Sequence, residues 1–183
     1  MQPEQLRAVF RVFTPEQRLA FWQDKLNQVI NLGGWNSNEA AFLNSVKSEL
    51  KLAWFTDDFK KDSVNVKSLK AVINKLKDGS NALGWSKKLM YGIFGSGYNL
   101  SDKNGTLTTP ISSGTDQSTL AVSSTKKLAT AASEATCSCA TSDDWCATQS
   151  GHDDSCKTGK CTTSSFGCGW LFTTSCNGLC SYL

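Results

Sequence analysis

Eight cysteines are the residues of this chain whose type and spacing predict chemistry. All of them lie within 44 residues, and the 136 residues before them contain none. Their spacing is C-x-C-x6-C-x9-C-x4-C-x6-C-x7-C-x3-C, at Cys137, Cys139, Cys146, Cys156, Cys161, Cys168, Cys176 and Cys180. An even number of cysteines in a short, loop-rich segment predicts a disulfide framework, and eight cysteines allow 105 pairings. We expect four disulfides, with their pairing left open.

The segment that holds the cysteines has few large apolar side chains. Ser, Thr, Gly, Asp and Asn fill most of it, and the sizeable hydrophobic residues are Trp145, Phe166, Trp170, Leu171 and Phe172. So small an apolar set cannot offset the entropy of ordering the segment, and cross-links are expected to compensate. Trp170, Leu171 and Phe172 are candidates for contact with a membrane or a receptor, because aromatic groups suit both. The alternative is that they form the small core of this segment.

A metal site is the competing interpretation of the cysteines. Structural zinc favours C-x2-4-C pairs and matched histidines, whereas only the last two cysteines have that spacing and His152 is the only histidine. We therefore favour disulfides and expect His152 to lie in a solvated turn. Two aspartate pairs, at 143–144 and 153–154, are expected to be solvated rather than to bind calcium, since no EF-hand spacing is present.

No catalytic motif is present in the sequence. It has no G-x-S-x-G or H-E-x-x-H motif and no glycine-rich phosphate loop. Catalysis by a cysteine and a histidine needs a free thiol, and the predicted framework uses all eight. We expect no enzyme activity and no cofactor.

Residues 1–94 are predicted to form an all-α helical bundle. Apolar residues recur at helical spacing in five segments, and the second begins with a capping signal at Thr14-Pro15-Glu16-Gln17. Gly33-Gly34 is expected to end that second helix, although a double glycine is also a processing signal in some exported peptides. The fourth segment is predicted to end at Asp78-Gly79, and the fifth covers about 81–94.

Residues 95–136 are predicted to be a Ser/Thr-rich linker. Sixteen of these 42 residues are serine or threonine, and the apolar residues show no strong period. A linker of this kind is open to proteases, so we expect processing at the basic pair Lys126 and Lys127 or at the small residues Ala135 and Thr136. Residues 137–183 then form the disulfide-rich module, with little regular structure. We expect the helical region and this module to melt independently.

Charge divides unevenly between these parts. The module has four aspartates and two lysines, a net charge of −2, so the remainder carries +5 of the total +3. No basic cluster is interleaved with aromatic residues, which argues against nucleic acid as a partner. The sequence opens without an apolar secretory signal, and we expect that such a signal has been removed from a protein that is secreted, periplasmic or on the cell surface. A cytosolic protein with reduced thiols is the alternative.

The cysteine module resembles the bacteriocin fulvocin C-related family. The resemblance is carried by Cys137-Ser138-Cys139, by Ser142-Asp143-Asp144-Trp145-Cys146, by Gly167-Cys168-Gly169-Trp170 and by the late pair Cys176 and Cys180. The segment Thr14–Gln17, followed by Trp22 and Lys25, is similar to the helical region that precedes the module in such proteins.

This resemblance implies a precursor with a helical pro-region, a linker and a compact antibacterial peptide. We therefore expect a secreted bacteriocin-like protein whose partner is a bacterial envelope target or a membrane surface. The alternative is a non-toxic extracellular interaction protein, such as an accessory subunit that binds envelope or secretion-complex proteins.

Overall fold

The computed structural model describes residues 3–111, 136–148 and 152–182. The helices are α1 (Pro3–Val12), α2 (Pro15–Leu32), α3 (Ser37–Glu49), α4 (Ser63–Ala82) and α5 (Lys87–Phe94). The 3-10 turns are η1 (Leu52–Trp54), η2 (Phe59–Lys61), η4 (Cys146–Thr148) and η5 (Trp170–Phe172). The strands are β1 (Tyr98–Leu100), β2 (Leu107–Pro110), β3 (His152–Lys157), β4 (Ser164–Cys168), β5 (Thr174–Cys176) and β6 (Leu179–Tyr182). Among the described residues, no helix has the length and apolar character needed to cross a membrane.

The ends of α2 confirm the signals in its sequence. Thr14 and Gln17 form a reciprocal capping box, and Pro15 occupies the first turn, where its missing N–H costs nothing. The helix ends before Gly33, whose φ of 77° lies in the left-handed region that glycine adopts readily.

The fourth and fifth helices differ from the prediction: the fifth was expected over about 81–94, and α5 begins at Lys87 after the cap residue Ser86. Instead of ending at Gly79, α4 continues to Ala82, and the turn falls at Gly84, with φ of 69°. Inside the helix, the absence of a side chain at Gly79 makes room for the ring of Phe42, because a Cβ there would come within 2.3 Å of that ring. A glycine required by close packing therefore gave a false stop signal.

The first part of the predicted linker is folded. Residues 98–110 form the antiparallel hairpin β1–β2, which pairs Leu100 with Leu107 and packs against α2 and α5. The hairpin is fixed to α2 by Gln28, whose side chain both donates to and accepts from the backbone of Leu100. Only residues 112–135 of the predicted linker lie outside the described residues.

The cysteine module contains more regular structure than expected. Strands β3 and β6 form one antiparallel pair, and β4 and β5 form another. The two strands of the short β4–β5 hairpin are cross-linked by Cys168–Cys176, which joins the last residue of β4 to the last residue of β5. The prediction of little regular structure was wrong because short strands rich in Ser, Thr and Cys lack the apolar alternation that marks a strand in a sequence.

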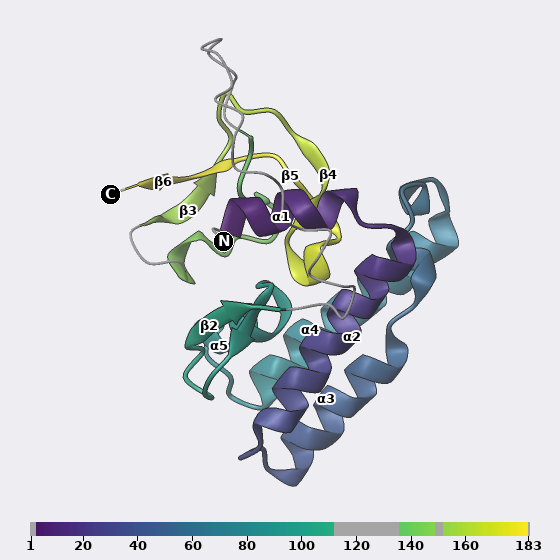
Figure 1. The fold of residues 1–183 in the computed structure, drawn as a ribbon, viewed down its shortest axis with the longest axis vertical. Coiled ribbons are helices and arrows are strands. Elements are labelled where there is room, and N and C mark those ends of the chain that lie inside the picture. Colours follow the sequence, from purple (N-terminus) through teal and green to yellow (C-terminus); the bar gives the residue numbers. More distant parts are fainter. Residues whose placement is uncertain (1–2, 112–135, 149–151, 183) are drawn as a thin grey trace.

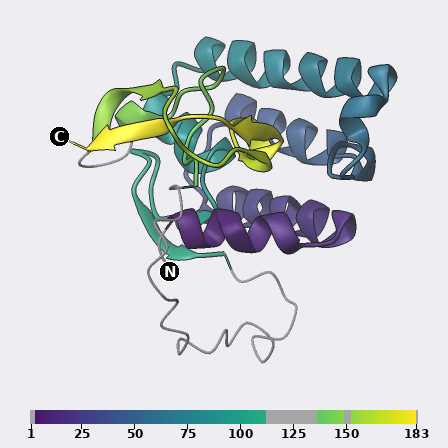
Figure 2. The same cartoon turned by 90° about the horizontal axis from the view of Figure 1, so that it is seen from above.

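The two parts share one core. In Figure 1, α1 lies against the module, while α2, α3 and α4 extend away from it. Figure 2 shows the module beside the helices rather than separated from them. One buried cluster contains side chains from α1, α2, α4 and α5 together with Trp145, Phe166 and the residues of η5. Position 137 is therefore a boundary in composition but not in core packing, and the predicted independence of the two parts finds no support in this packing.

Candidate functional site

All eight cysteines are paired in the structure. The disulfides are Cys137–Cys161, Cys139–Cys156, Cys146–Cys180 and Cys168–Cys176, and no cysteine is free. The sulfur atoms of Cys139, Cys146 and Cys180 lie within 4.8 Å of one another because two of these bridges pack together. A sulfur atom in a disulfide is not a thiolate, so this cluster does not offer zinc the ligands that it requires.

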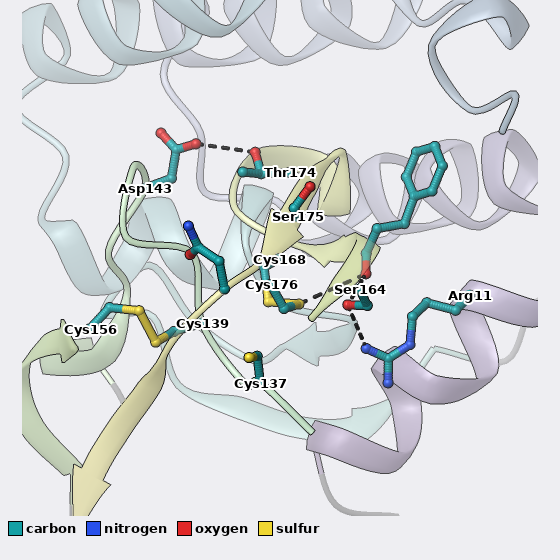
Figure 3. The surroundings of a disulfide bond; sticks show 12 residues. Arg11, Cys137, Cys139, Asp143, Cys156, Ser164, Cys168, Thr174, Ser175 and Cys176 are labelled. Atoms are coloured by element: carbon teal, nitrogen blue, oxygen red, sulfur yellow. Dashed lines mark hydrogen bonds between the residues drawn. A yellow bond between two sulfur atoms is a disulfide. The ribbon is translucent and has the colours of Figure 1, made fainter. Parts of the chain in front are cut away.

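Adjacent aspartates have separate structural roles in the module. The carboxylate of Asp144 accepts the backbone N–H groups of Cys146 and Cys156 at 2.9 and 2.8 Å and so orients two bridges. Asp143 accepts the hydroxyl of Thr174 at 3.2 Å and is only 10% exposed (Figure 3). The expectation that this pair is simply solvated is therefore wrong. His152 begins strand β3, where its backbone pairs with Tyr182, so the expectation that it lies in a turn was wrong. The side chains of His152, Asp153 and Asp154 lie outside the described residues.

The residues Gly169–Thr173, which we call the apolar loop, protrude from the β4–β5 hairpin. Gly169, Leu171 and Phe172 have positive φ values of 68°, 52° and 55°. The left-handed region suits glycine but is unfavourable for large L side chains. The hydroxyl of Thr173 donates to the carbonyl of Trp170 at 2.8 Å, which helps to close the turn. The loop therefore holds an unfavourable backbone conformation that its surroundings must stabilise.

Phe172 of the apolar loop inserts between the first two helices. Its ring centroid lies 5.2 Å from those of Phe10 and Trp22 and 6.2 Å from that of Phe21. Edge-to-face pairs at such distances stabilise aromatic clusters beyond the effect of buried area alone. We call Phe10, Phe21 and Trp22 the aromatic seat of the loop.

Trp170 packs on the other side of the apolar loop. Its ring lies 4.9 Å from that of Trp145 and 5.6 Å from that of Phe94. Trp170, Leu171 and Phe172 are exposed by only 4%, 0% and 3%. In this conformation they are core residues, as the alternative interpretation of the sequence expected, and their contact with a membrane or receptor stays a prediction. The sequence could not reveal which groups cover them, because Phe10, Phe21, Trp22 and Phe94 lie in the helical region, far away along the chain.

Three basic side chains of the helices bind the outer edge of the module. Arg11 donates to the hydroxyl of Ser164 at 2.9 Å, as Figure 3 shows. Lys60 donates to the carbonyl of Ser165 at 3.0 Å and to the hydroxyl of Ser175 at 2.6 Å. Lys77 forms an ion pair of 3.1 Å with Asp143. We call these contacts the polar seam, and they bring the basic helical region against the acidic module.

Sequence reasoning missed Arg18, although it lies at the contact between the helical region and the module, which we call the junction. It is buried on α2, and its guanidinium donates to the carbonyls of Phe10, Arg11 and Phe55. The same group lies 4.6 Å above the ring of Phe166 on β4. One side chain thus joins α1, α2, the η1 turn and the module. Its position in an otherwise apolar helical stripe was the only signal in the sequence.

Lys25 is another buried cation that was missed as such. Its side chain is fully buried, and its ammonium group donates to the carbonyl of Tyr98 in β1. Burial lowers the pKa of Lys25 to about 7, because an apolar environment disfavours the charged form. Within the described residues, no carboxylate lies within ion-pair distance of this group.

Glu39 links the start of α3 to the segment before α5 and to the turn between β1 and β2. It caps α3 through the N–H of Asn36 and accepts hydrogen bonds from Trp85 and Lys103. Burial raises the pKa of Glu39, but the hydrogen bonds from Lys103, Asn36 and Trp85 outweigh it and hold the pKa below its ordinary value. The arrangement is structural, because each bond satisfies a buried or terminal donor.

A cleft of about 360 Å³ opens where α4 and α5 meet the module. It is lined by Lys77, Asn81, Lys87, Met90, Ser142, Asp143, Asp144, Trp145 and Trp170. Water therefore reaches one edge of the packed tryptophan pair. This is a point at which solvent approaches the apolar loop.

The predicted processing residues fall mostly outside the described part of the chain. Lys126, Lys127 and Ala135 are among those residues, so the structure does not test them. Thr136 is described; it is exposed and pairs with Thr162 in a parallel bridge. Cleavage at Thr136 would therefore break a bridge at the start of the module.

The fold and the site define a class of protein in which a helical region and a module with four disulfides share their main apolar core. Such cross-links form and persist in an extracellular or otherwise oxidising environment. No model of a protein family, no curated protein and no solved structure matches this chain.

Proposed function

We propose that this protein is a secreted, bacteriocin-like protein that acts on bacterial envelopes through its disulfide module. The observation that carries the proposal is the apolar loop, in which a disulfide-closed hairpin holds Trp170, Leu171 and Phe172 consecutively. Consecutive aromatic and aliphatic side chains of this kind are suited to inserting into a membrane interface once the helices no longer cover them. The similarity of the cysteine pattern to the fulvocin C-related family supports the same function.

The mechanism depends on apolar contact rather than on charge. Cationic peptides gain about 1 kcal/mol from each basic residue near an anionic lipid surface. The module carries a net charge of −2 and lacks that attraction. Insertion of the loop, or binding to a specific envelope receptor, is therefore the consistent mode of action.

Growth inhibition by the purified, oxidised full chain tests this function. We expect the protein to permeabilise at least some members of a panel of bacteria, measured by entry of a membrane-impermeant dye. The matched variant Leu171→Asn replaces an apolar side chain with a polar one. Asparagine tolerates the positive φ at this position, so the backbone conformation of the loop can be kept. Equal permeabilisation by both proteins, or none by the native chain on any strain, would contradict the proposal.

A non-toxic extracellular interaction protein is the second candidate. The continuous core favours it, because a protein whose helices and module pack together is suited to act intact. In that case the intact chain would copurify with envelope or secretion-complex proteins after cross-linking. A free peptide with the mass of the module in culture fluid would instead favour the bacteriocin-like function.

A further inference from the structure

We propose that α1 and α2 mask a latent membrane-inserting element, and that the apolar loop becomes available when the module separates from its aromatic seat. This inference rests on the proposed function and adds its regulation. The residues best suited to contact a bilayer are the same residues that the helices cover. Opening of the junction would therefore convert a closed protein into one that binds membranes.

The seat stabilises a conformation that the apolar loop does not favour by itself. Leu171 and Phe172 lie in the left-handed region with φ of 52° and 55°. Such outliers persist where surrounding structure determines them, and they concentrate at switch regions and ligand clamps. Here the surrounding structure includes Phe10, Phe21 and Trp22, which are all residues of the helical region. Separation would remove these contacts and allow the loop to relax.

Packing around the apolar loop is also incompletely satisfied. The indole N–H groups of Trp22 and Trp145 are buried without a hydrogen-bond acceptor in the described part of the chain. Both tryptophans contact aromatic rings of the loop. Burying an unpaired donor costs free energy, and opening would let water reach these groups. These two buried, unpaired N–H groups thus make the closed state locally less stable around the loop.

The balance between the two states depends on the surroundings of the protein. In water, opening exposes large apolar side chains, so the closed state is favoured. At a bilayer the exposed loop can insert, and the bilayer therefore binds the open state better than the closed one. A ligand shifts a conformational equilibrium only through such a difference in affinity. An uncharged lipid surface is sufficient, because the acidic module gains nothing from anionic lipid.

The polar seam provides a way to weaken the junction while every apolar side chain of the loop and its seat is kept, although Lys77 also lies 5.9 Å from the ring centroid of Trp170. Arg11, Lys60 and Lys77 each bind the module from the helical side. The triple variant Arg11→Ala, Lys60→Ala and Lys77→Ala removes these contacts from the full chain. The control variant Lys47→Ala, Lys67→Ala and Lys70→Ala removes three positive charges on α3 and α4 without touching the seam.

Vesicles of phosphatidylcholine and phosphatidylethanolamine are the probe. We expect the seam variant to partition onto them at least about tenfold more than the native chain, with similarly faster hydrogen exchange in residues 168–173, because local opening governs both. The control variant should match the native chain. Adding Leu171→Asn to the seam variant should open the junction further and yet reduce vesicle binding, since the inserting side chain is lost. If the added substitution acted only by unfolding the whole chain, vesicle binding would increase instead of falling.

One result would overturn the proposal: a seam variant that binds vesicles no more than the native chain at any temperature up to the onset of melting, whether or not its loop exchanges faster. Failure of the proposed function is distinct: a seam variant that binds vesicles but permeabilises no bacterium would refute bacteriocin-like action and leave the masking intact. Retained binding after Leu171→Asn would show that another surface is responsible.

Discussion

Lys25 should make the stability of this protein depend on pH between about 7 and 10.5. Its folded pKa is lowered from 10.5 to about 7 by burial, so the folded state releases a proton in a range where the unfolded chain retains it. The stability is fully present above the unfolded pKa, is lost as the pH falls through this window, and stays constant below about 7. At 1.36 kcal/mol for each pH unit, a shift of about 3.5 units corresponds to at most about 5 kcal/mol.

The variant Lys25→Met isolates this contribution. Methionine keeps a long, flexible apolar side chain and removes the titrating group, but it leaves the carbonyl of Tyr98 without this donor at a cost of about 1–3 kcal/mol. We expect the native free energy of unfolding to rise by about 2–3 kcal/mol from pH 7 to pH 9, and that of the variant to change much less. The variant should therefore lose relative stability as the pH rises.

Urea unfolding monitored by tryptophan fluorescence at a series of pH values measures this difference. Lys67→Met, on the exposed side of α4, is the matched control and should show the same pH dependence as the native chain. Parallel pH profiles for the native protein and Lys25→Met would refute the reasoning. They would mean that Lys25 remains charged in the folded protein, with a compensating group close to its ammonium.

The remaining predictions concern the junction and the cross-links. Phe172→Ala should destabilise the whole chain by about 3–5 kcal/mol because it leaves a cavity in the shared core. Calorimetry should still show one unfolding transition, whereas two transitions would mean that the helical region and the module unfold independently. Arg18→Met should cost about 3–5 kcal/mol because it leaves buried carbonyls without a donor, whereas Asp57→Asn, at a carboxylate whose side chain is 77% exposed, should cost less than about 1 kcal/mol in a urea titration. The intact mass should be eight hydrogen atoms below that of the reduced chain, and alkylation without reductant should add nothing; uptake of an alkylating reagent would refute the four bridges. Cleavage at an engineered protease site between Lys127 and Leu128 should leave two fragments that migrate together in size exclusion and separate in denaturant, because the core joins them; spontaneous release of the module would contradict the shared core.

Local chemistry determined much of the helical region and all of the cross-linked character. The capping box of α2 and its glycine stop depend on residues three or four positions apart, so the sequence alone predicts them correctly. The disulfide framework follows from the number and spacing of cysteines in a segment with few apolar residues. Neither inference requires knowledge of distant contacts.

Long-range packing decided the pairing of the cysteines and the role of the apolar loop. Eight cysteines fit many frameworks, and only the fold places Cys146 beside Cys180 across 34 positions. Trp170, Leu171 and Phe172 have the composition of a contact surface in the sequence. The tertiary structure instead buries them, with Phe172 against α1 and α2 and Trp170 against α5 and Trp145. The sequence determined that these side chains must leave water, because their apolar area is large. Only the three-dimensional fold decided that the helices of the same chain would cover them, since the burial of apolar area is non-directional and does not specify a partner.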